Sequence, residues 1–241
     1  MRTCKTVLCL LGLVACGGDD GGDVTPDAVQ ADAPIVSIDA PMCSVASTVV
    51  YLNRAGGVYT RAAINDASTN QSTIIPMTAT IAAAPIPDPT WETVKACIAS
   101  KFADFNIAFT DVDPAASPHR ELVLVGNPNR KENGIGDGLF GVAPFDCMNI
   151  EQAIAFVDGM LLTDPTELCE LSSQMIANTF GLDHVYACSD LMGFLSPCGP
   201  RQFVDANTAC GEFVARDCCS GEPTQNSHGK LLAAIGPTCS P

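Results

Sequence analysis

A helix with clear signals at both ends constrains the fold of this chain more than any other feature. Asp164 is a good N-cap, Pro165 suits the first helical position, and Glu167 completes a capping box. Gly181 predicts the end of the helix, because glycine readily adopts the left-handed conformation that follows a helix. Apolar residues recur at helical spacing along the face that we expect to be buried: Leu168, Leu171 and Met175.

Short segments rich in β-branched and aromatic residues come before this helix and predict a sheet. They lie at residues 49–52, 107–112, 121–126, 139–144 and 153–157. The segment 121–126 is a nearly continuous apolar run, which is typical of a strand buried on both faces. The segment 139–144 ends in Pro144, which favours a position at the edge of the sheet.

A second helix is expected at residues 89–105, with Asp88 as its cap and Pro89 in its first turn. Its apolar residues predict one buried face: Trp91, Val94, Ile98, Phe102 and Phe105. A last helix is expected at residues 228–235, with Ser227 as its cap. Residues 58–88 give weaker signals, and the segment 74–82 fits either a strand or a loop.

The end of the capped helix carries a spaced pattern in Gln174–His184. Gly181 and His184 fall in the places of the last glycine and histidine of H-E-x-x-H-x-x-G-x-x-H, so the stretch resembles the zinc-binding helix of metzincin metallopeptidases. The predicted order of strand, helix, two strands, edge strand, strand and helix is similar to the N-terminal half of metzincins. Met192, soon after His184, is similar to the turn methionine that matrixins place beneath their metal.

This resemblance covers about residues 48–236. It implies an α+β, zincin-like domain with a mixed sheet, two main helices and a disulfide-rich C-terminal subdomain. It also implies that the edge strand borders a substrate cleft, and that three imidazoles and one glutamate serve a zinc ion.

Three chemical positions of the motif are substituted. Gln174, Met175 and Asn178 stand where metzincins have His, Glu and His. Amide oxygens suit calcium better than zinc, and a thioether cannot take a proton from a metal-bound water. His184 is the surviving ligand position, so we expect no catalytic residue, no zinc and no other cofactor. The alternative is a metallopeptidase that hydrolyses peptide bonds at an unorthodox zinc site.

Nearby residues offer little replacement for the missing ligands. His119 is expected in a surface loop, and His228 is expected on the surface of the last helix. Asp183 and Asp190 add only oxygen atoms near the motif, and Cys188 is expected in a disulfide.

Two interpretations of the former metal pocket remain open. In the first, Gln174 and Asn178 bond to each other, to His184 or to water, because buried amides need partners. In the second, the emptied cleft still binds a peptide or protein along Phe140–Ala143 by strand addition.

The cysteines after Cys16 predict a disulfide framework, because even, dense sets in exported proteins are usually oxidised. They are Cys43, Cys97, Cys147, Cys169, Cys188, Cys198, Cys210, Cys218, Cys219 and Cys239. Their pairing cannot be deduced. Adjacent Cys218 and Cys219 are expected to have different partners, since a vicinal bridge is strained. Residues 193–223 are expected to be a loop region held by disulfides.

Residues 1–15 have the features of a lipoprotein signal peptide, with an apolar run too short to cross a bilayer. Leu13-Val14-Ala15-Cys16 resembles a bacterial lipobox, so we expect acylation of Cys16 and anchoring to a membrane. Ordinary secretory cleavage nearby is the alternative. Residues 16–42 are rich in Gly, Asp and Pro and predict an acidic tether before a folded domain at 43–241.

The charge balance narrows the possible partners. The chain has 12 Lys and Arg against 27 Asp and Glu, a net charge of −15. Removal of residues 1–15 takes away Arg2 and Lys5 and makes the chain still more acidic. Such a surface repels phosphate backbones and argues against nucleic-acid binding. The sequence therefore predicts a bacterial cell-envelope lipoprotein, periplasmic or surface-exposed, whose inactive peptidase-like domain binds or scaffolds.

Overall fold

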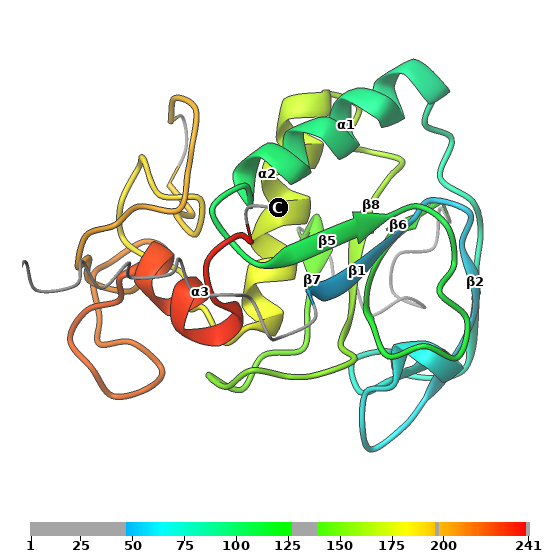
Figure 1. The fold of residues 1–241 in the computed structure, drawn as a ribbon, viewed down its shortest axis with the longest axis horizontal. Coiled ribbons are helices and arrows are strands. Elements are labelled where there is room, and N and C mark those ends of the chain that lie inside the picture. The colour runs from blue at the N-terminus through cyan, green and yellow to red at the C-terminus, as the bar shows by residue number, and fades with distance from the viewer. Residues whose placement is uncertain (1–46, 127–138, 196–197, 240–241) are drawn as a thin grey trace, which may run out of the picture. The chain divides into compact units, whose positions relative to one another are not determined.

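The computed structural model describes residues 47–126, 139–195 and 198–239. Within these ranges the chain has a mixed α+β fold with a five-stranded sheet, a three-stranded sheet and three α-helices (Figure 1). The larger sheet has the order β5 (Ile107–Thr110), β1 (Thr48–Asn53), β6 (Arg120–Val125), β8 (Ile154–Asp158) and β7 (Gly141–Val142). Its strands are parallel except β7, which is antiparallel to β8 and lies at the edge.

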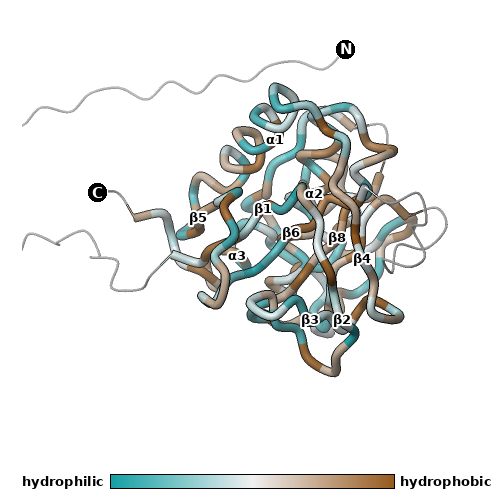
Figure 2. Tube along the Cα trace, turned by 90° about the vertical axis from the view of Figure 1, so that its right-hand side faces the viewer, coloured by the Kyte–Doolittle hydropathy of each residue, from teal (hydrophilic) through white to brown (hydrophobic). Residues whose placement is uncertain are grey.

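The central strands β6 and β8 separate two hydrophobic cores, because successive side chains of a strand point to opposite faces. Leu122 and Leu124 pack into the core that also contains the helices. Val123 and Val125 pack into the second core on the other face. Every residue of both strands is buried, which confirms the strand predicted from the apolar run at 121–126. Figure 2 shows hydrophobic segments passing through the middle of the molecule at β8.

Helices α1 (Asp88–Lys101) and α2 (Pro165–Thr179) contact each other, and α2 also contacts β8, β7 and β6. The predicted cap of α2 is confirmed: the Asp164 carboxylate accepts hydrogen bonds from the backbone N–H groups of Thr166 and Glu167 at 2.8 and 3.0 Å. Gly181 follows with a φ of 81°. A Cβ atom at Gly181 would lie 2.6 Å from the Cys147 carbonyl oxygen, so a side chain does not fit here.

Helix α1 differs from the prediction at both ends. It ends at Lys101 rather than near 105, and its N-cap is Pro87 rather than Asp88. The Asp88 carboxylate instead forms an ion pair with Arg54. The predicted apolar face is confirmed, since its members are all buried: Trp91, Val94, Ile98, Phe102 and Phe105.

The segment between β1 and α1 forms a small sheet, whose last strand lies within residues 74–82, where the sequence fitted either a strand or a loop. Strand β2 (Gly57–Arg61) pairs in parallel with β3 (Gln71–Ser72), which follows the 3₁₀ turn η1 (Ala67–Thr69). It pairs antiparallel with β4 (Ala79–Ile81). Side chains from this sheet complete the second core beside β6 and β8.

A buried polar cluster joins the two sheets. Glu121 of β6 accepts hydrogen bonds from the Tyr59 hydroxyl at 2.7 Å and from Asn53 Nδ2 at 2.8 Å. Burial raises the pKa of Glu121, although these hydrogen bonds act in the opposite direction. The neighbouring His119 is buried, which corrects the expectation of a surface loop residue; its Nδ1 lies 2.7 Å from the Ser117 carbonyl oxygen.

The C-terminal part contains α3 (Ser227–Ile235) after a long irregular region. Asn226, and not Ser227, caps this helix by accepting a hydrogen bond from Gly229 N at 2.7 Å. His228 lies in its first turn as expected, and its ring packs 5.0 Å from that of Phe105. In the described part of the chain, no helix is both long and apolar enough to cross a membrane.

Four disulfides occur among the described residues: Cys97–Cys169, Cys147–Cys219, Cys188–Cys198 and Cys210–Cys218. The first joins α1 to α2. The adjacent Cys218 and Cys219 have different partners, as predicted. Cys239 is also disulfide-bonded. The signal peptide, the tether, Cys16 and Cys43 lie outside the described residues.

Candidate functional site

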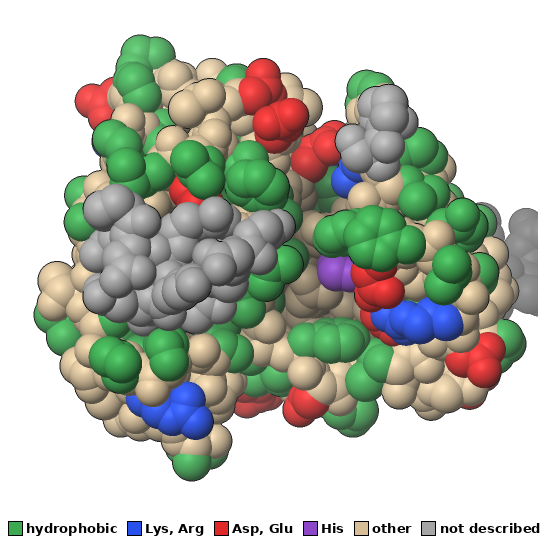
Figure 3. Space-filling model, turned by 180° about the vertical axis from the view of Figure 1, so that it is seen from behind, with side chains coloured by type: hydrophobic (Ala, Val, Ile, Leu, Met, Phe, Trp, Pro, Cys, Tyr) green, Lys and Arg blue, Asp and Glu red, His purple; other side chains and the backbone are tan. Residues whose placement is uncertain are grey.

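A cleft lies between the edge strand β7, helix α2 and the irregular C-terminal region (Figure 3). Its larger hollow has a volume of about 450 Å³ and the smaller about 250 Å³. Gly141, Met175 and His184 line both hollows, so they form the junction of the cleft. The larger hollow also has apolar walls: Leu139, Phe140, Leu162, Leu171 and Phe194.

The edge strand presents open backbone groups to this cleft. Asp158 N donates to the Phe140 carbonyl oxygen at 2.8 Å, and Val142 is opposite Phe156. Because bonded pairs alternate along antiparallel strands, the N–H and C=O of Gly141 point away from β8. The larger sheet has no strand beyond β7 among the described residues. An extended chain can therefore bond to β7 on this side.

Met175 fills the space where the motif has its glutamate. A Cβ atom on Gly141 would lie 2.9 Å from Met175 Cγ and 3.0 Å from its Sδ. The thioether thus packs directly against the backbone of β7, and its side chain is buried. This position supplies apolar contact and no proton acceptor.

Gln174 ties helix α2 to the turn that contains Met192. Its Nε2 lies 3.2 Å from the Leu191 carbonyl oxygen and 3.4 Å from that of Gly193. Met192 is fully buried between these two residues, and its carbonyl oxygen accepts a hydrogen bond from Val185 N at 3.1 Å. The side-chain amide of Gln174 therefore links helix α2 to the turn that contains Met192, and this turn is hydrogen-bonded to Val185, the residue after His184.

Asn178 closes the turn at the end of the helix. Its Nδ2 donates to the Leu182 carbonyl oxygen at 2.8 Å. In one of the two interpretations left open by the sequence, the two amides bond to each other, to His184 or to water. The amide nitrogens instead donate to backbone carbonyls, because the turns after α2 bring these oxygens within reach.

His184 is held by a charged network. Its Nδ1 lies 3.3 Å from Glu212 Oε1, and a carboxylate can only accept, so Nδ1 carries the hydrogen. Arg216 donates to the same Glu212 oxygen at 2.8 Å. It also donates to both carboxylate oxygens of Asp183 at 2.7 and 2.9 Å. The network fixes the orientation of the imidazole in the cleft wall.

Asp183 is the buried anchor of this network. Burial acts to raise its pKa, but hydrogen bonds from Arg216 and from the backbone N–H groups of Cys219 and His184 outweigh burial and lower the pKa below its ordinary value. Asp190 is also buried and supports the methionine turn by accepting from Met192 N at 2.8 Å. Burial raises the pKa of Asp190.

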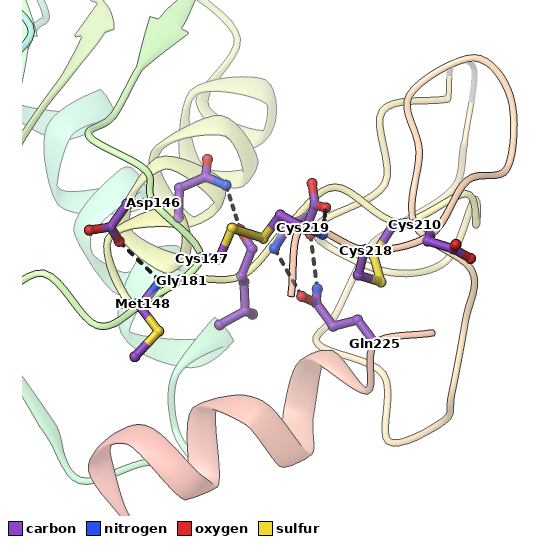
Figure 4. The surroundings of a disulfide bond; sticks show 12 residues. Asp146, Cys147, Met148, Gly181, Cys210, Cys218, Cys219 and Gln225 are labelled. Atoms are coloured by element: carbon purple, nitrogen blue, oxygen red, sulfur yellow. Dashed lines mark hydrogen bonds between the residues drawn. A yellow bond between two sulfur atoms is a disulfide. The ribbon is translucent and has the colours of Figure 1, made fainter. Parts of the chain in front are cut away.

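The Cys147–Cys219 disulfide lies beside the turn that follows α2 (Figure 4). It joins the loop before β8 to the C-terminal segment beside Gly181. Gln225 reinforces this junction, because its side-chain amide bonds to both Asp183 N and Asp183 O at 2.9 Å. The turn after α2 is thus fixed by covalent and hydrogen bonds.

The donors in the cleft do not fit a zinc ion. The motif has three metal-ligand positions, and only His184 offers an imidazole at one of them. At the other two, the NH₂ groups of Gln174 and Asn178 are directed to carbonyl oxygens. His184 Nε2 is buried and has no hydrogen-bond partner among the described residues. In the same part of the chain, no group of three or more His, Cys, Asp or Glu residues is arranged to hold a metal.

Sequence reasoning missed several residues that shape the cleft: Phe194, Arg201, Glu212 and Arg216. They lie in the irregular region, which has no periodic pattern to reveal which side chains point inward. No known protein-family model matches the chain, and no curated protein matches it in sequence.

Proposed function

We propose that this chain is a bacterial cell-envelope lipoprotein whose metzincin-like domain binds an extended polypeptide in the cleft without hydrolysing it. One observation carries this proposal: open backbone groups of β7 face an apolar cleft, while the amides of Gln174 and Asn178 are used to hold the surrounding turns. Acyl chains on Cys16 anchor the domain to the membrane in this account.

The order of elements supports the metzincin-like part of the proposal. Strand β1, helix α1, strands β5, β6, β7 and β8, and helix α2 come in this order along the chain, with the small sheet of β2, β3 and β4 inserted between β1 and α1. Strand β7 is at the edge of its sheet and borders the cleft, as the resemblance implies for an edge strand beside a substrate. The methionine turn lies next to His184 through the bond between Val185 and Met192.

Strand addition is the binding mode that the cleft favours. An added strand bonds to main-chain groups such as those of Gly141, and its alternate side chains point toward or away from the cleft. The absence of a side chain at Gly141 lets Met175 pack against the β7 backbone, while the Gly141 N–H and C=O, which lie in the plane of the sheet, point to the side where a strand can add. The apolar walls then bury the side chains that point inward.

Backbone methylation of the ligand tests this mode. We would first select a short peptide that binds the purified chain, using fluorescence anisotropy with an apolar peptide library. Two derivatives would then be made, one N-methylated at odd positions and the other at even positions. Strand addition predicts that one derivative loses affinity about tenfold, since two or more hydrogen bonds are lost, while the other binds normally.

Equal affinities of the two methylated peptides would reject strand addition. Failure of every library member to bind would reject the binding function itself.

A matched pair of protein variants tests the location of the binding site. Phe194→Ala removes an apolar wall of the cleft, whereas Val112→Ala removes an even more solvent-exposed apolar side chain outside it. Only the first should weaken binding.

Metal content tests the non-catalytic part. The parent chain should purify without stoichiometric zinc and without peptidase activity. A variant with Gln174→His, Met175→Glu and Asn178→His restores the motif, and its uptake of zinc would support an inherited metal pocket. Zinc in the parent that disappears in His184→Ala would instead identify a metallopeptidase with an unorthodox site.

A further inference from the structure

We propose that the cleft selects a basic polypeptide segment, with large apolar side chains in its middle and lysine or arginine beside them. This inference rests on the binding function proposed above and names the ligand class. It combines an apolar surface around the cleft with the charges along it.

Exposed apolar side chains gather around the cleft. They are Leu139, Phe140, Phe145 and Phe194, which line it, and Phe213, which contacts Phe194. Phe213 and Val214 are 75% and 71% exposed. The ring of Phe194 lies 5.2 Å from that of Phe213 and 5.5 Å from that of His184, which extends the apolar wall from the cleft floor to the surface. Contiguous exposed apolar surface of this kind is typical of a site that a partner covers.

The loop that carries Phe213 and Val214 is held in place before any ligand binds. The Cys210–Cys218 disulfide closes it, and Arg216 N donates to the Cys210 carbonyl oxygen at 2.7 Å. The Arg216 side chain then fixes the loop to buried Asp183. A wall that is already ordered loses little conformational entropy on binding, so its apolar area contributes efficiently to affinity.

The charged residues of the cleft leave an excess of negative charge. The acidic residues that line the two hollows are Glu167, Glu170, Asp183 and Glu212, and the basic ones are Arg201 and Arg216. Arg201 and Lys101 both lie near Glu170, and Arg216 binds both Asp183 and Glu212, so Glu167 is the lining carboxylate without an ion pair among the described residues. Both arginines are therefore already engaged by carboxylates. An acidic ligand would meet repulsion here, whereas a basic one would meet attraction.

Glu167 is a carboxylate of the cleft that can attract a basic residue of the ligand. Glu167 lies in the first turn of α2, its side chain lines the larger hollow, and no ion pair involves it among the described residues. Glu212, by contrast, lines only the smaller hollow and is already bound by Arg216 and His184. A strand added to β7 runs along the larger hollow, so a basic residue beside its apolar centre can pair with the carboxylate of Glu167.

Three peptides with the same apolar centre test the inference. Their flanking residues are lysine, glutamine or glutamate, and their affinities for the purified chain are measured by fluorescence anisotropy at low salt. We expect the lysine peptide to bind about tenfold more tightly than the glutamate peptide, with the glutamine peptide between them. The differences should shrink as salt is added, because the charges are partly exposed.

Two protein variants locate the effect. Glu167→Gln removes one carboxylate from the cleft and keeps a residue type that suits its helical position. It should reduce the preference for lysine about threefold, as expected for one exposed ion pair. Glu222→Gln makes the same change in net charge at an exposed residue that does not line the cleft, and the preference should stay as in the parent.

The possible outcomes separate this inference from the function on which it rests. If the three peptides bind with equal affinity, the binding function stands and the selection of basic segments is wrong. If both glutamate variants reduce the preference equally, the effect comes from net charge and not from the cleft. If none of the peptides binds, both proposals are wrong.

Discussion

The hydrogen bonds of Gln174 give the most specific prediction about this fold. A Gln174→Met variant keeps a side chain of similar shape but removes the donor to Leu191 O and Gly193 O, which lie 3.2 and 3.4 Å away. In the variant, the Gly193 carbonyl oxygen still accepts a hydrogen bond from Arg201 Nη1 at 2.8 Å, so it is mainly the Leu191 carbonyl oxygen that loses its donor. A buried carbonyl without a partner costs about 1–3 kcal/mol. We therefore expect the free energy of unfolding to fall by about 2 kcal/mol.

Denaturant unfolding measures this loss directly. Trp91 is the single tryptophan of the chain and is buried, so its fluorescence reports unfolding of the core. For a domain of about this size, a loss of 2 kcal/mol lowers the melting temperature by roughly 4–8 °C. Leu171→Met, on the same helix, is the control and should cost less because it leaves no polar group unpaired.

A small effect would refute this reasoning. If Gln174→Met changes the unfolding free energy by less than about 0.5 kcal/mol, in the range of ordinary surface substitutions, the amide does not hold the methionine turn. Gln174 would then have no structural role, and the explanation for the neutral amide at this position would fail.

Three further predictions concern charge and covalent bonding. Arg216→Gln removes the ion-pair partner of the Asp183 carboxylate. Because the pKa of Asp183 is lowered in the folded protein, its contribution to stability is present above the unfolded-state pKa and is lost as pH falls. In urea titrations, the variant should be about 2 kcal/mol less stable than the parent at pH 7, and its stability should fall less steeply at acid pH. Burial raises the pKa of Glu121 above its ordinary value, so its stabilisation is lost as pH rises. Glu121→Gln, which cannot ionise, should gain stability relative to the parent as pH rises above that ordinary value, and a difference that stays constant with pH would contradict this. Replacement of Cys147 and Cys219 by serine should lower the unfolding free energy by about 2–4 kcal/mol in the same titrations.

Local signals in the sequence account for most of the correct predictions. The N-cap Asp164 and the glycine at 181 fix the ends of α2 through backbone geometry, so they act whatever surrounds them. The apolar run of β6 likewise reveals burial on both faces. Strands β2 and β3 were missed, and β4 was left open between strand and loop, because these strands are short and are defined by pairing with residues outside each segment.

The candidate site was predictable only in part. The sequence alone locates the substituted positions and indicates that their chemistry differs from that of the motif. It does not place the carbonyl oxygens of Leu182, Leu191 and Gly193, which satisfy the amides, because these positions depend on turns. The burial of His119 is another tertiary effect, since its loop composition indicated a surface position.

The central claim is that the cleft binds polypeptide and leaves it intact. Equilibrium dialysis of the purified chain against the lysine-flanked peptide, with mass spectrometry of both compartments, tests this in a single measurement. We predict enrichment of the peptide on the protein side and an unchanged peptide mass after prolonged incubation. Shorter fragments would contradict the loss of catalysis, and equal concentrations in the two compartments would contradict binding.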